Sequence, residues 1–435
     1  MTRLTARAPQ PRRWKRYAGV FALALLPLAA AAQAVPPPAT LAAPGASADE
    51  LLAIARQMSP DLAAMGLEAE AAVARADAAG SLPDPVFRGE FEEIDRRAGS
   101  LLPDRLGMIK YSIQQEFPLW GKRDLRMGVA RSEASTARER RRAAETELVA
   151  RIKTVFAGYY AAHEAFRLTE DLARGVGALA DVAQRRYAQG LGNQQEVLKA
   201  AIERTEVQTD MARLEAEKRK TAAQINALLN RAPGEPLSAP RSLRPIPPEA
   251  TLKLAELLER ARLANPQLAA GEAQILAAEG GRTLVDKSWY PDVTLGIAAV
   301  DRDRRFTGYE AMIEFKIPLR WGLRRAQERE AAAMLGAAKS RLDATAARVQ
   351  GEIEEAYWSL EAASKIYRLL HGAHLPQARL AYDTALGGYE VGRVDLATVL
   401  EAEQRVRRVL LEHLKVLVEQ HARLADIERL IGGEL

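Results

Sequence analysis

The sequence has no cysteine among its 435 residues. Disulfides, thiolate metal sites and cysteine nucleophiles are therefore excluded, as is attachment through a lipidated N-terminal cysteine. It also lacks a Gly-rich phosphate loop and a His-Glu metalloprotease motif, so we expect neither an enzyme nor a cofactor. The 62 basic residues face 57 acidic ones, and this near balance gives little support to a nucleic-acid partner.

Long apolar runs are scarce as well, and the main one lies near the N-terminus. The run from Tyr17 to Ala32 follows a basic stretch, and Ala32-Gln33-Ala34 offers small residues for cleavage. A transmembrane anchor is the alternative, but the run is short for a membrane span. We predict a signal peptide over residues 1–34, an exported mature chain without a helical membrane span, and a flexible Pro- and Ala-rich lead-in over 35–47.

The rest of the chain is duplicated, with an offset of about 200 residues. Matching segments keep the same order in both halves. They are Ser59-Pro60-Asp61-Leu62 with Asn265-Pro266-Gln267-Leu268, Leu82-Pro83-Asp84 with Tyr290-Pro291-Asp292, Phe117-Pro118-Leu119 with Ile317-Pro318-Leu319, Trp120-Gly121 with Trp321-Gly322, and Tyr187-Ala188-Gln189-Gly190 with Tyr389-Glu390-Val391-Gly392. We predict a first repeat over 48–232, a Pro-rich linker over 233–248 and a second repeat over 249–435.

Each repeat is predicted to contain a helix, two strands and a long helical hairpin. The opening helix of the first repeat is expected from Asp49 to Ala79. No proline occurs between Pro118 and Pro233, so a continuous helix, about 100 Å long, is predicted from Lys122 to Ala188, with a hairpin tip at Gly190-Leu191-Gly192. The second helix of each predicted hairpin carries a coiled-coil stripe of apolar residues. In the first repeat Lys218 fills the one gap in this stripe. The stripe residues are Val207, Met211, Leu214, Thr221, Ile225 and Leu228 in the first repeat and Val406, Leu410, Leu417, Leu424, Ile427 and Ile431 in the second.

Four segments alternate polar and apolar residues with period two, at 86–92, 109–117, 293–297 and 311–317. Segments of ~10 residues with one polar and one apolar face are typical of a transmembrane β-barrel. Aromatic residues stand at the strand ends, where such a barrel has its aromatic girdle; they are Trp120, Trp289, Tyr290 and Trp321. Polar loops are predicted at Ile94 to Gly107 and Asp301 to Gly308. Two hairpins of a soluble sheet are the alternative interpretation.

A membrane barrel has to close, because lipid cannot satisfy the hydrogen bonds of an open sheet edge. Four strands are too few, since such barrels start at ~8 strands. Copies of the chain would therefore pool their strands: two would give a tight, filled barrel, and three a wider one with a lumen. The predicted fold class is α+β, with long helical hairpins that extend the barrel into the periplasm.

This duplicated arrangement resembles the TolC-like outer-membrane efflux proteins over nearly all of the mature chain. Its most specific parts are the paired tip motifs, Tyr187 to Gly190 followed by Glu196-Val197-Leu198, and Tyr389 to Gly392 followed by Thr398 to Ala402. The resemblance implies a homotrimer with a 12-stranded β-barrel and a periplasmic α-barrel, a periplasmic adaptor and an inner-membrane pump. The segment Phe117 to Arg123 looks like the heavy-metal efflux branch. Many family members carry a lipidated N-terminal cysteine, and this chain departs from them.

The resemblance also implies roles for residues near the two tips. In the family, acidic residues there form rings that constrict the closed end, and a ring of like charges selects cations. The matching positions are Glu196, Glu401 and, more loosely, Asp395. The family's adaptor-docking tips match Gly190, Leu191, Gly192, Gly392, Arg393 and Val394. A solvated helix face and ordinary turn glycines are the alternative interpretations.

Histidine and arginine clusters predict no binding site. His371 and His374 are too few to hold a metal, and Pro376 predicts a solvated helix end beside them. His413 falls on the apolar stripe and is expected to pack there. The arginines between Arg138 and Arg142 fit a solvated helix face better than a nucleic-acid site.

The predicted function is a passive outer-membrane duct for export, with metal cations as one class of cargo and an inner-membrane pump as the source of energy. A duct for drug efflux or type I protein secretion is an alternative. A soluble periplasmic coiled-coil adaptor is another, although an adaptor usually has one long hairpin where this chain has two. An enzyme on a helical scaffold is the third class, and it lacks a site.

Overall fold

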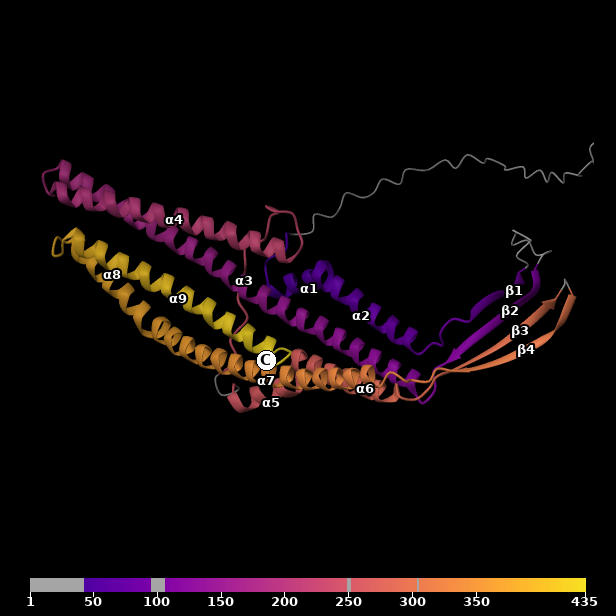
Figure 1. Cartoon of the computed structure of the whole chain (residues 1–435). Helices are drawn as coiled ribbons and strands as arrows, with labels where there is room; N and C mark the ends of the chain where they lie inside the picture. The colour runs from indigo at the N-terminus through magenta and orange to yellow at the C-terminus, as the bar shows by residue number, and fades with distance from the viewer. Residues whose placement is uncertain (1–42, 95–105, 249–251, 303–304) are drawn as a thin grey trace, which may run out of the picture. The chain divides into compact units, whose positions relative to one another are not determined.

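The computed structural model describes residues 43–94, 106–248, 252–302 and 305–435 (Figure 1). The predicted signal peptide, residues 35–42 of the lead-in and most of the first polar loop lie outside the described residues. The first repeat contains α1 (Ala48–Met58), α2 (Pro60–Ala79), β1 (Val86–Ile94), β2 (Leu106–Phe117), α3 (Lys122–Ala188) and α4 (Gln194–Leu228). The second contains α5 (Leu254–Ala264), α6 (Pro266–Lys287), β3 (Val293–Arg302), β4 (Arg305–Phe315), α7 (Trp321–Leu369), the π-helix η3 (Leu370–His374), α8 (Leu375–Glu390) and α9 (Leu396–Leu430).

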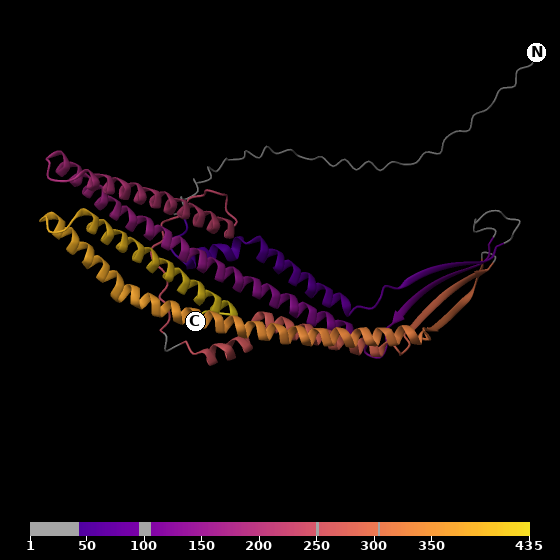
Figure 2. The same cartoon turned by 60° about the vertical axis from the view of Figure 1, so that its left-hand side comes forward.

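The long helix predicted from Lys122 to Ala188 is confirmed as α3, with 67 residues. It begins after Trp120 and Gly121, whose φ angles of 63° and 74° turn the chain out of β2. Helix α3 contacts α2, α4, α6 and α9, so helices of both repeats lie along it. Within residues 43–435 the strands lie at one end of the long helices and both hairpin tips at the other (Figures 1 and 2).

The opening helix of each repeat is interrupted once, and the single helix expected from Asp49 to Ala79 is wrong. Ser59 has ψ 116° between α1 and α2, because the ring of the following proline disfavours the helical region for the residue before it. Its side chain then caps α2 by accepting from the Leu62 amide. Asn265 does the same before Pro266 in the second repeat. The duplication therefore extends to the helix caps.

The helix end expected near Pro376 is also wrong. Helix α7 continues through η3 into α8 without leaving the helical path. A proline inside a helix removes one hydrogen bond, and its ring clashes with the carbonyl four residues back. The wider π turn before Pro376 relieves that clash. Leu370 and Leu375 on either side of this turn are buried in an apolar cluster, so tertiary packing holds the chain helical there.

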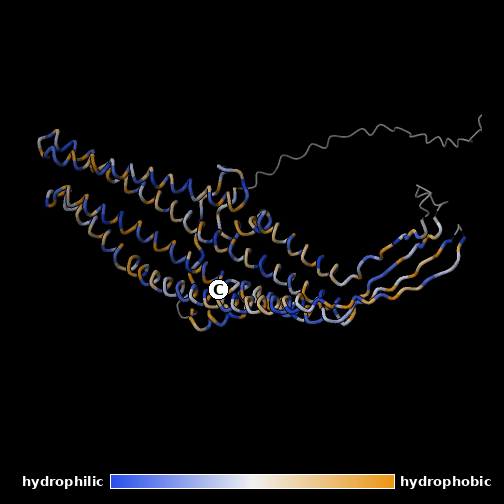
Figure 3. Tube along the Cα trace, viewed as in Figure 1, coloured by the Kyte–Doolittle hydropathy of each residue, from blue (hydrophilic) through white to orange (hydrophobic). Residues whose placement is uncertain are grey.

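The four strands form one antiparallel sheet in the order β1-β2-β3-β4. All four predicted strands are confirmed, but the polar loop expected from Asp301 to Gly308 is wrong in extent, because β3 runs to Arg302 and β4 runs from Arg305 to Phe315. The central pairing joins the two repeats, with Phe117 opposite Val293 and Ile113 opposite Ile297. This register places most of the large apolar side chains on one face, where they are exposed from 44% at Leu295 to 82% at Tyr309, whereas Ile109 on the same face is buried. Figure 3 shows apolar positions along every strand.

Buried apolar side chains gather in clusters along the helices. Phe156 of α3 and Ile225 of α4 belong to one cluster in the first repeat, and Ile353 and Ile427 occupy a corresponding cluster in the second. Lys218, which fills the gap in the predicted stripe, places its ammonium 4.3 Å from the centre of the Phe166 ring. Within the described residues, none of the helices is both long and apolar enough to cross a membrane.

The lead-in and the linker hold each other where the structure describes both. The Ser238 amide donates to the Pro44 carbonyl at 2.9 Å, and the Arg241 amide donates to Ala46 at 3.1 Å. The Glu50 carboxylate accepts from the Gly45 and Ala46 amides. The flexible lead-in that composition predicts is therefore wrong for residues 43–47, because these hydrogen bonds fix its backbone.

A buried ion pair closes the junction between sheet and helices. The Lys122 ammonium lies 2.8 Å from the Asp292 carboxylate and 2.7 Å from the Tyr290 carbonyl, so the first repeat is tied to the second. Trp120 Nε1 donates to the Pro291 carbonyl at 2.9 Å, and its ring centre lies 5.1 Å from that of Tyr290. The aromatic residues predicted at the strand ends therefore reinforce this junction.

We predict that Lys122→Met lowers the free energy of unfolding by about 3 kcal/mol, because Asp292 would stay largely buried without its partner. Denaturant unfolding of the detergent-purified protein, followed by helical circular dichroism, measures the loss. Lys339→Met is the matched control, since the Lys339–Glu279 pair is exposed and 3.6 Å long, and a change below about 0.5 kcal/mol is expected. Equal losses in both variants would contradict a special role for the junction.

Candidate functional site

The two hairpin tips have the same backbone geometry. Gly190 and Gly392 adopt φ angles of 72° and 71°, in the left-handed region that glycine occupies without strain. In each tip the next residue closes the helix end: the Leu191 amide donates to the Arg186 carbonyl, and the Arg393 amide donates to the Gly388 carbonyl, both at 2.8 Å. The glycines are thus turn residues, as the plainer interpretation requires, and a docking role for these positions stays a prediction.

The remaining predicted tip residues differ in exposure. Leu191 is 68% exposed at the end of the first hairpin, and Arg393 is exposed at the end of the second. Gly192 and Val394 are half-buried. A Cβ on Gly388 would come within 2.6 Å of the Val394 side chain, so Val394 packs down onto α8. The tips therefore expose two large apolar side chains, Leu191 and Val391, and the Arg393 cation.

The two tips also pack against each other. Leu179 of α3, Ala200 of α4, Tyr389 of α8 and Leu396 of α9 belong to one buried cluster. The Arg186 guanidinium lies 5.0 Å above the centre of the Tyr389 ring, which joins α3 to α8. A displacement of one hairpin would therefore act directly on the other.

The three acidic residues predicted for a gate have different local partners. Glu196 lies beside the N-cap of α4, because its amide donates to the Asn193 side-chain oxygen at 2.8 Å while its carboxylate accepts from the Asn193 side-chain amide. Asp395 caps α9 by accepting from the Thr398 amide at 3.1 Å and from its hydroxyl at 2.5 Å. The hydrogen bonds from Thr398 lower the pKa of Asp395. Glu401 is exposed and makes no hydrogen bond or ion pair with the described residues.

A buried charge cluster between α4 and α9 was not predicted from the sequence. The Arg407 guanidinium lies 2.7 Å from Glu203, 3.6 Å from Asp210 and 3.7 Å from Glu403. Gln404 also donates to the Glu203 carboxylate. This cluster ties the returning helix of the first hairpin to the returning helix of the second.

Glu403 is the unusual member of this cluster. Its side chain is 0% exposed, and neither carboxylate oxygen has a hydrogen-bond partner among the described residues. Burial, opposed by Arg407 and reinforced by Glu203, raises the pKa of Glu403 to about 7. The carboxyl therefore changes charge near neutral pH, in a position where Arg407 already faces two other carboxylates.

One signal in the sequence could have located this cluster. Glu203 lies one helical turn before Val207, and Glu403 lies three residues before Val406, so both carboxylates continue the apolar stripes toward the tips. A charged residue on a buried stripe needs a partner of opposite sign. Arg407 follows Glu403 by one turn, and its spacing fits that need.

The histidines pack as aromatic residues. His413 is half-buried, with its ring centre 4.7 Å from that of Tyr367 and 5.4 Å from that of His371. The packing role predicted for His413 is confirmed, and burial lowers its pKa. Within the described ranges no group of three or more His, Cys, Asp or Glu side chains could hold a metal ion.

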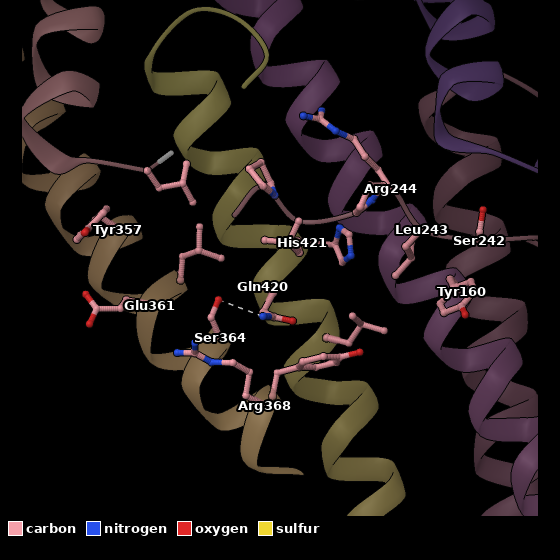
Figure 4. Close-up of a pocket in the computed structure, with 17 residues that line it drawn as sticks. Tyr160, Ser242, Leu243, Arg244, Tyr357, Glu361, Ser364, Arg368, Gln420 and His421 are labelled. Carbon is pink, nitrogen blue, oxygen red and sulfur yellow. Dashed lines mark hydrogen bonds between the residues drawn. The ribbon is translucent and has the colours of Figure 1, made fainter. Parts of the chain in front are cut away.

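A cavity of about 560 Å³ lies between α3, α7, α9 and linker residues 242–247 (Figure 4). Tyr160, Tyr367 and Leu360 line it together with polar groups. Gln420 donates to the Ser364 hydroxyl at 3.1 Å. Burial lowers the pKa of His421 to about 4, so its imidazole is neutral at neutral pH. The Ser364 hydroxyl accepts the hydrogen bond from Gln420, and no hydrogen bond joins it to a basic side chain within the described lining.

A family model described as outer membrane efflux protein matches residues 51–231 and 257–433, one segment in each repeat. The cobalt-zinc-cadmium resistance protein CzcC of Cupriavidus metallidurans is 24% identical over 316 residues, which are 72% of this chain and 74% of that protein. The outer-membrane channel OprN superposes with a TM-score of 0.76 at 18% identity, covering 89% of this chain and 90% of that chain. The outer membrane protein VceC of Vibrio cholerae superposes with a TM-score of 0.75 at 18% identity, covering 89% of this chain and 96% of that chain. The predicted α+β fold with its duplicated hairpins and four-stranded sheet is confirmed.

We predict that Glu403→Gln removes a pH dependence of stability. The folded state holds the Glu403 proton up to a pKa of about 7, whereas the unfolded state loses it near the ordinary value of 4.5. Stability is therefore expected to fall as pH rises between these values and to stay low above them. At pH 8 the variant should gain about 3 kcal/mol. Unfolding of the detergent-purified protein at pH 5, 6, 7 and 8 measures this.

The matched control for that experiment is Glu401→Gln, two residues away on the exposed face of α9. It should leave the pH profile of the wild-type protein unchanged. If Glu403→Gln kept the same slope as the wild type, the buried carboxyl would not be the group that titrates.

Proposed function

The chain belongs to the outer membrane efflux protein family, and from this premise we propose that three copies of it form a passive exit duct through the outer membrane. The helical part of the chain extends the duct into the periplasm. We further propose that a periplasmic adaptor binds the helical tips and that an inner-membrane pump supplies the energy. The observation that carries this proposal is a sheet with two unlike faces and two free edges.

The two faces of the sheet fit lipid on one side and water on the other. Phe87, Ile297 and Ile313 are each more than 60% exposed on the apolar face. On the opposite face Lys110 lies 3.4 Å from both Glu92 and Glu310. Strands of 9–12 residues are long enough to cross the apolar layer when tilted. One face would meet lipid, and the charged face would line the lumen.

Strand number favours three copies. A single chain contributes four strands, and its outer strands each have one unpaired edge among the described residues. Two copies would make a barrel whose interior side chains fill it, whereas three would make one wide enough for a lumen. The charged inner face would then be hydrated instead of packed, as its carboxylates require.

The helices also leave apolar side chains for neighbouring copies. Leu198 and Ile202 are more than half exposed on α4. Trp358, Leu369 and Leu380 are more than half exposed along α7 and α8. These residues lie on helices of different repeats, so one copy could bury its α4 face against the α7–α8 face of the next. Contacts of that kind would continue the barrel as a ring of helices.

We propose metal cations as the cargo. The relative CzcC carries cobalt, zinc and cadmium resistance in its name, and its similarity spans most of both chains. The carboxylates on the polar sheet face would favour cations in the lumen. Glu401, exposed and unpaired within the described chain, is proposed to form a ring at the narrow end, with Asp395 and Glu196 nearby.

We predict cation-selective channels from the purified protein in a planar bilayer, and a several-fold loss of cation preference in Glu401→Ala, because the variant removes one like-charged ring. Glu412→Ala is the control: Glu412 is exposed on the same helix, about three turns farther from the tip. It should change selectivity much less. A protein that never conducts, even after both tips are trimmed, would speak against the duct.

A cell-based measurement tests the cargo. In a host that lacks its own metal-efflux channel but retains the cognate pump and adaptor, the chain is expected to restore growth at raised zinc, cobalt or cadmium. Simultaneous Leu191→Asp and Arg393→Glu should abolish the rescue by spoiling the tip surfaces. Rescue of drug tolerance but not of metal tolerance would assign the duct to drug efflux instead.

A further inference from the structure

We propose that β4 of one copy pairs antiparallel with β1 of the next copy in one defined register, in which Phe315 lies opposite Phe87 and Glu314 opposite Arg88. The inference rests on the proposed duct, and it specifies the partner surface that closes it. The occupant of each free sheet edge is a second copy of this chain.

The internal seam between the repeats is the template for this pairing. Strands β2 and β3 belong to different repeats and pair antiparallel, with Gln115 opposite Leu295 and Gln114 opposite Gly296. In the second repeat β4 corresponds to β2, since Ile317-Pro318-Leu319 matches Phe117-Pro118-Leu119. In the first repeat β1 corresponds to β3, since Leu82-Pro83-Asp84 matches Tyr290-Pro291-Asp292.

Transferring the internal register by these matches fixes the contact between copies. Gln115 corresponds to Phe315 and Leu295 to Phe87, so Phe315 and Phe87 face each other. Both side chains lie on the apolar face and are more than half exposed. The pairing would therefore continue the apolar face from one copy to the next without a change of side.

Charges on the other face support this register. Gln114 corresponds to Glu314 and Gly296 to Arg88, so opposite charges meet across the strands. Glu314 is exposed and has no ion pair within the described chain, while Arg88 reaches only the neighbouring Glu90, at 3.5 Å. Glu310 would face Glu92, but Lys110 of each chain already binds these two carboxylates.

The neighbouring registers are less favourable. A shift of one residue would turn the apolar side chains of one copy into the lumen. With Phe87 opposite Ile313, Glu310 would face Glu90 and the Arg88 pairing would be lost. With Phe87 opposite Ile317, Glu314 would face Glu90, and Lys316 would face Arg88. Like charges directly opposite each other destabilise a strand pair.

The seam between copies would differ from the internal seam at the helix junction. Inside the chain the buried ion pair of Lys122 and Asp292 closes the junction. By the match of Trp120-Gly121 with Trp321-Gly322, Leu323 takes the place of Lys122, and Asp84 takes that of Asp292. Both are exposed in the single chain. The contact between copies would thus lack the ion pair that holds the repeats together.

Disulfide trapping tests the register directly, because the natural chain contains no cysteine. The full chain carrying Phe87→Cys and Phe315→Cys is expressed in the outer membrane, oxidised and run on a non-reducing gel. These positions lie at opposite edges of one sheet, so a disulfide joins different copies. We expect products up to three chains in size, at least about tenfold above the register-shifted pairs, whose Cα atoms would be about 7–8 Å apart.

Three further variants make the result decisive. Phe87→Cys with Ile313→Cys and Phe87→Cys with Ile317→Cys report the two shifted registers. Ile113→Cys with Ile297→Cys is the internal control and should oxidise within one chain, because these residues are direct partners. Preferential linking through Ile313 or Ile317 would overturn the register. If the internal control oxidised and no pair linked copies, the seam itself would be wrong.

A charge exchange gives an independent readout. Arg88→Glu should reduce the fraction of protein that stays assembled in unheated SDS, and Arg88→Glu with Glu314→Arg should restore it. Failure of the exchange to restore assembly would argue against the pairing. Conductance measured on the same samples separates the two proposals. Channels without any disulfide link between β4 and β1 would overturn this seam and leave the proposed duct intact. A protein without channels would overturn the duct.

Discussion

Lipid offers no hydrogen bonds to a peptide group, and the rest of this structure depends on that constraint. The apolar face of the described sheet favours the membrane, but β1 and β4 each leave an edge unpaired. One chain therefore cannot stay in the apolar layer alone, whereas a closed ring of chains can. The long helices continue the same plan, because each chain supplies two hairpins that pack side by side and expose apolar residues to further copies.

Duplication explains how one chain can make a segment of such a wall. The seam between β2 and β3 already solves the pairing of two repeats, and a ring of chains needs only to use that solution again. The helix caps at Ser59 and Asn265 and the tip turns at Gly190 and Gly392 show that the repeats kept their backbone geometry.

Much of the fold follows from local signals in the sequence. The absence of proline and the glycine turn gave the bounds of the helix that begins at Lys122, and alternation gave the strands. The break at Ser59 also has a local signal, because Pro60 follows it. The prediction missed the break because it drew one helix across this proline. The π turn before Pro376 depended on tertiary burial, which no local signal contains. The charge cluster at Glu403 was missed for the same reason, because its partners lie on another helix.

The internal seam and the proposed seam between copies would differ in strength. Within a chain, Lys122 and Asp292 form a buried ion pair at the junction, and Arg407 draws α4 to α9 through a second one. Breaking either leaves an unpaired buried charge, so the repeats of one chain resist separation. The matching surface of the proposed seam carries Leu323 and Asp84, and both are exposed in the single chain. A single copy therefore leaves no buried charge without a partner there. On this proposal a chain would complete its own sheet and hairpins first and meet its neighbours afterwards, with the hydrogen bonds of the free strand edges as the main gain on closure.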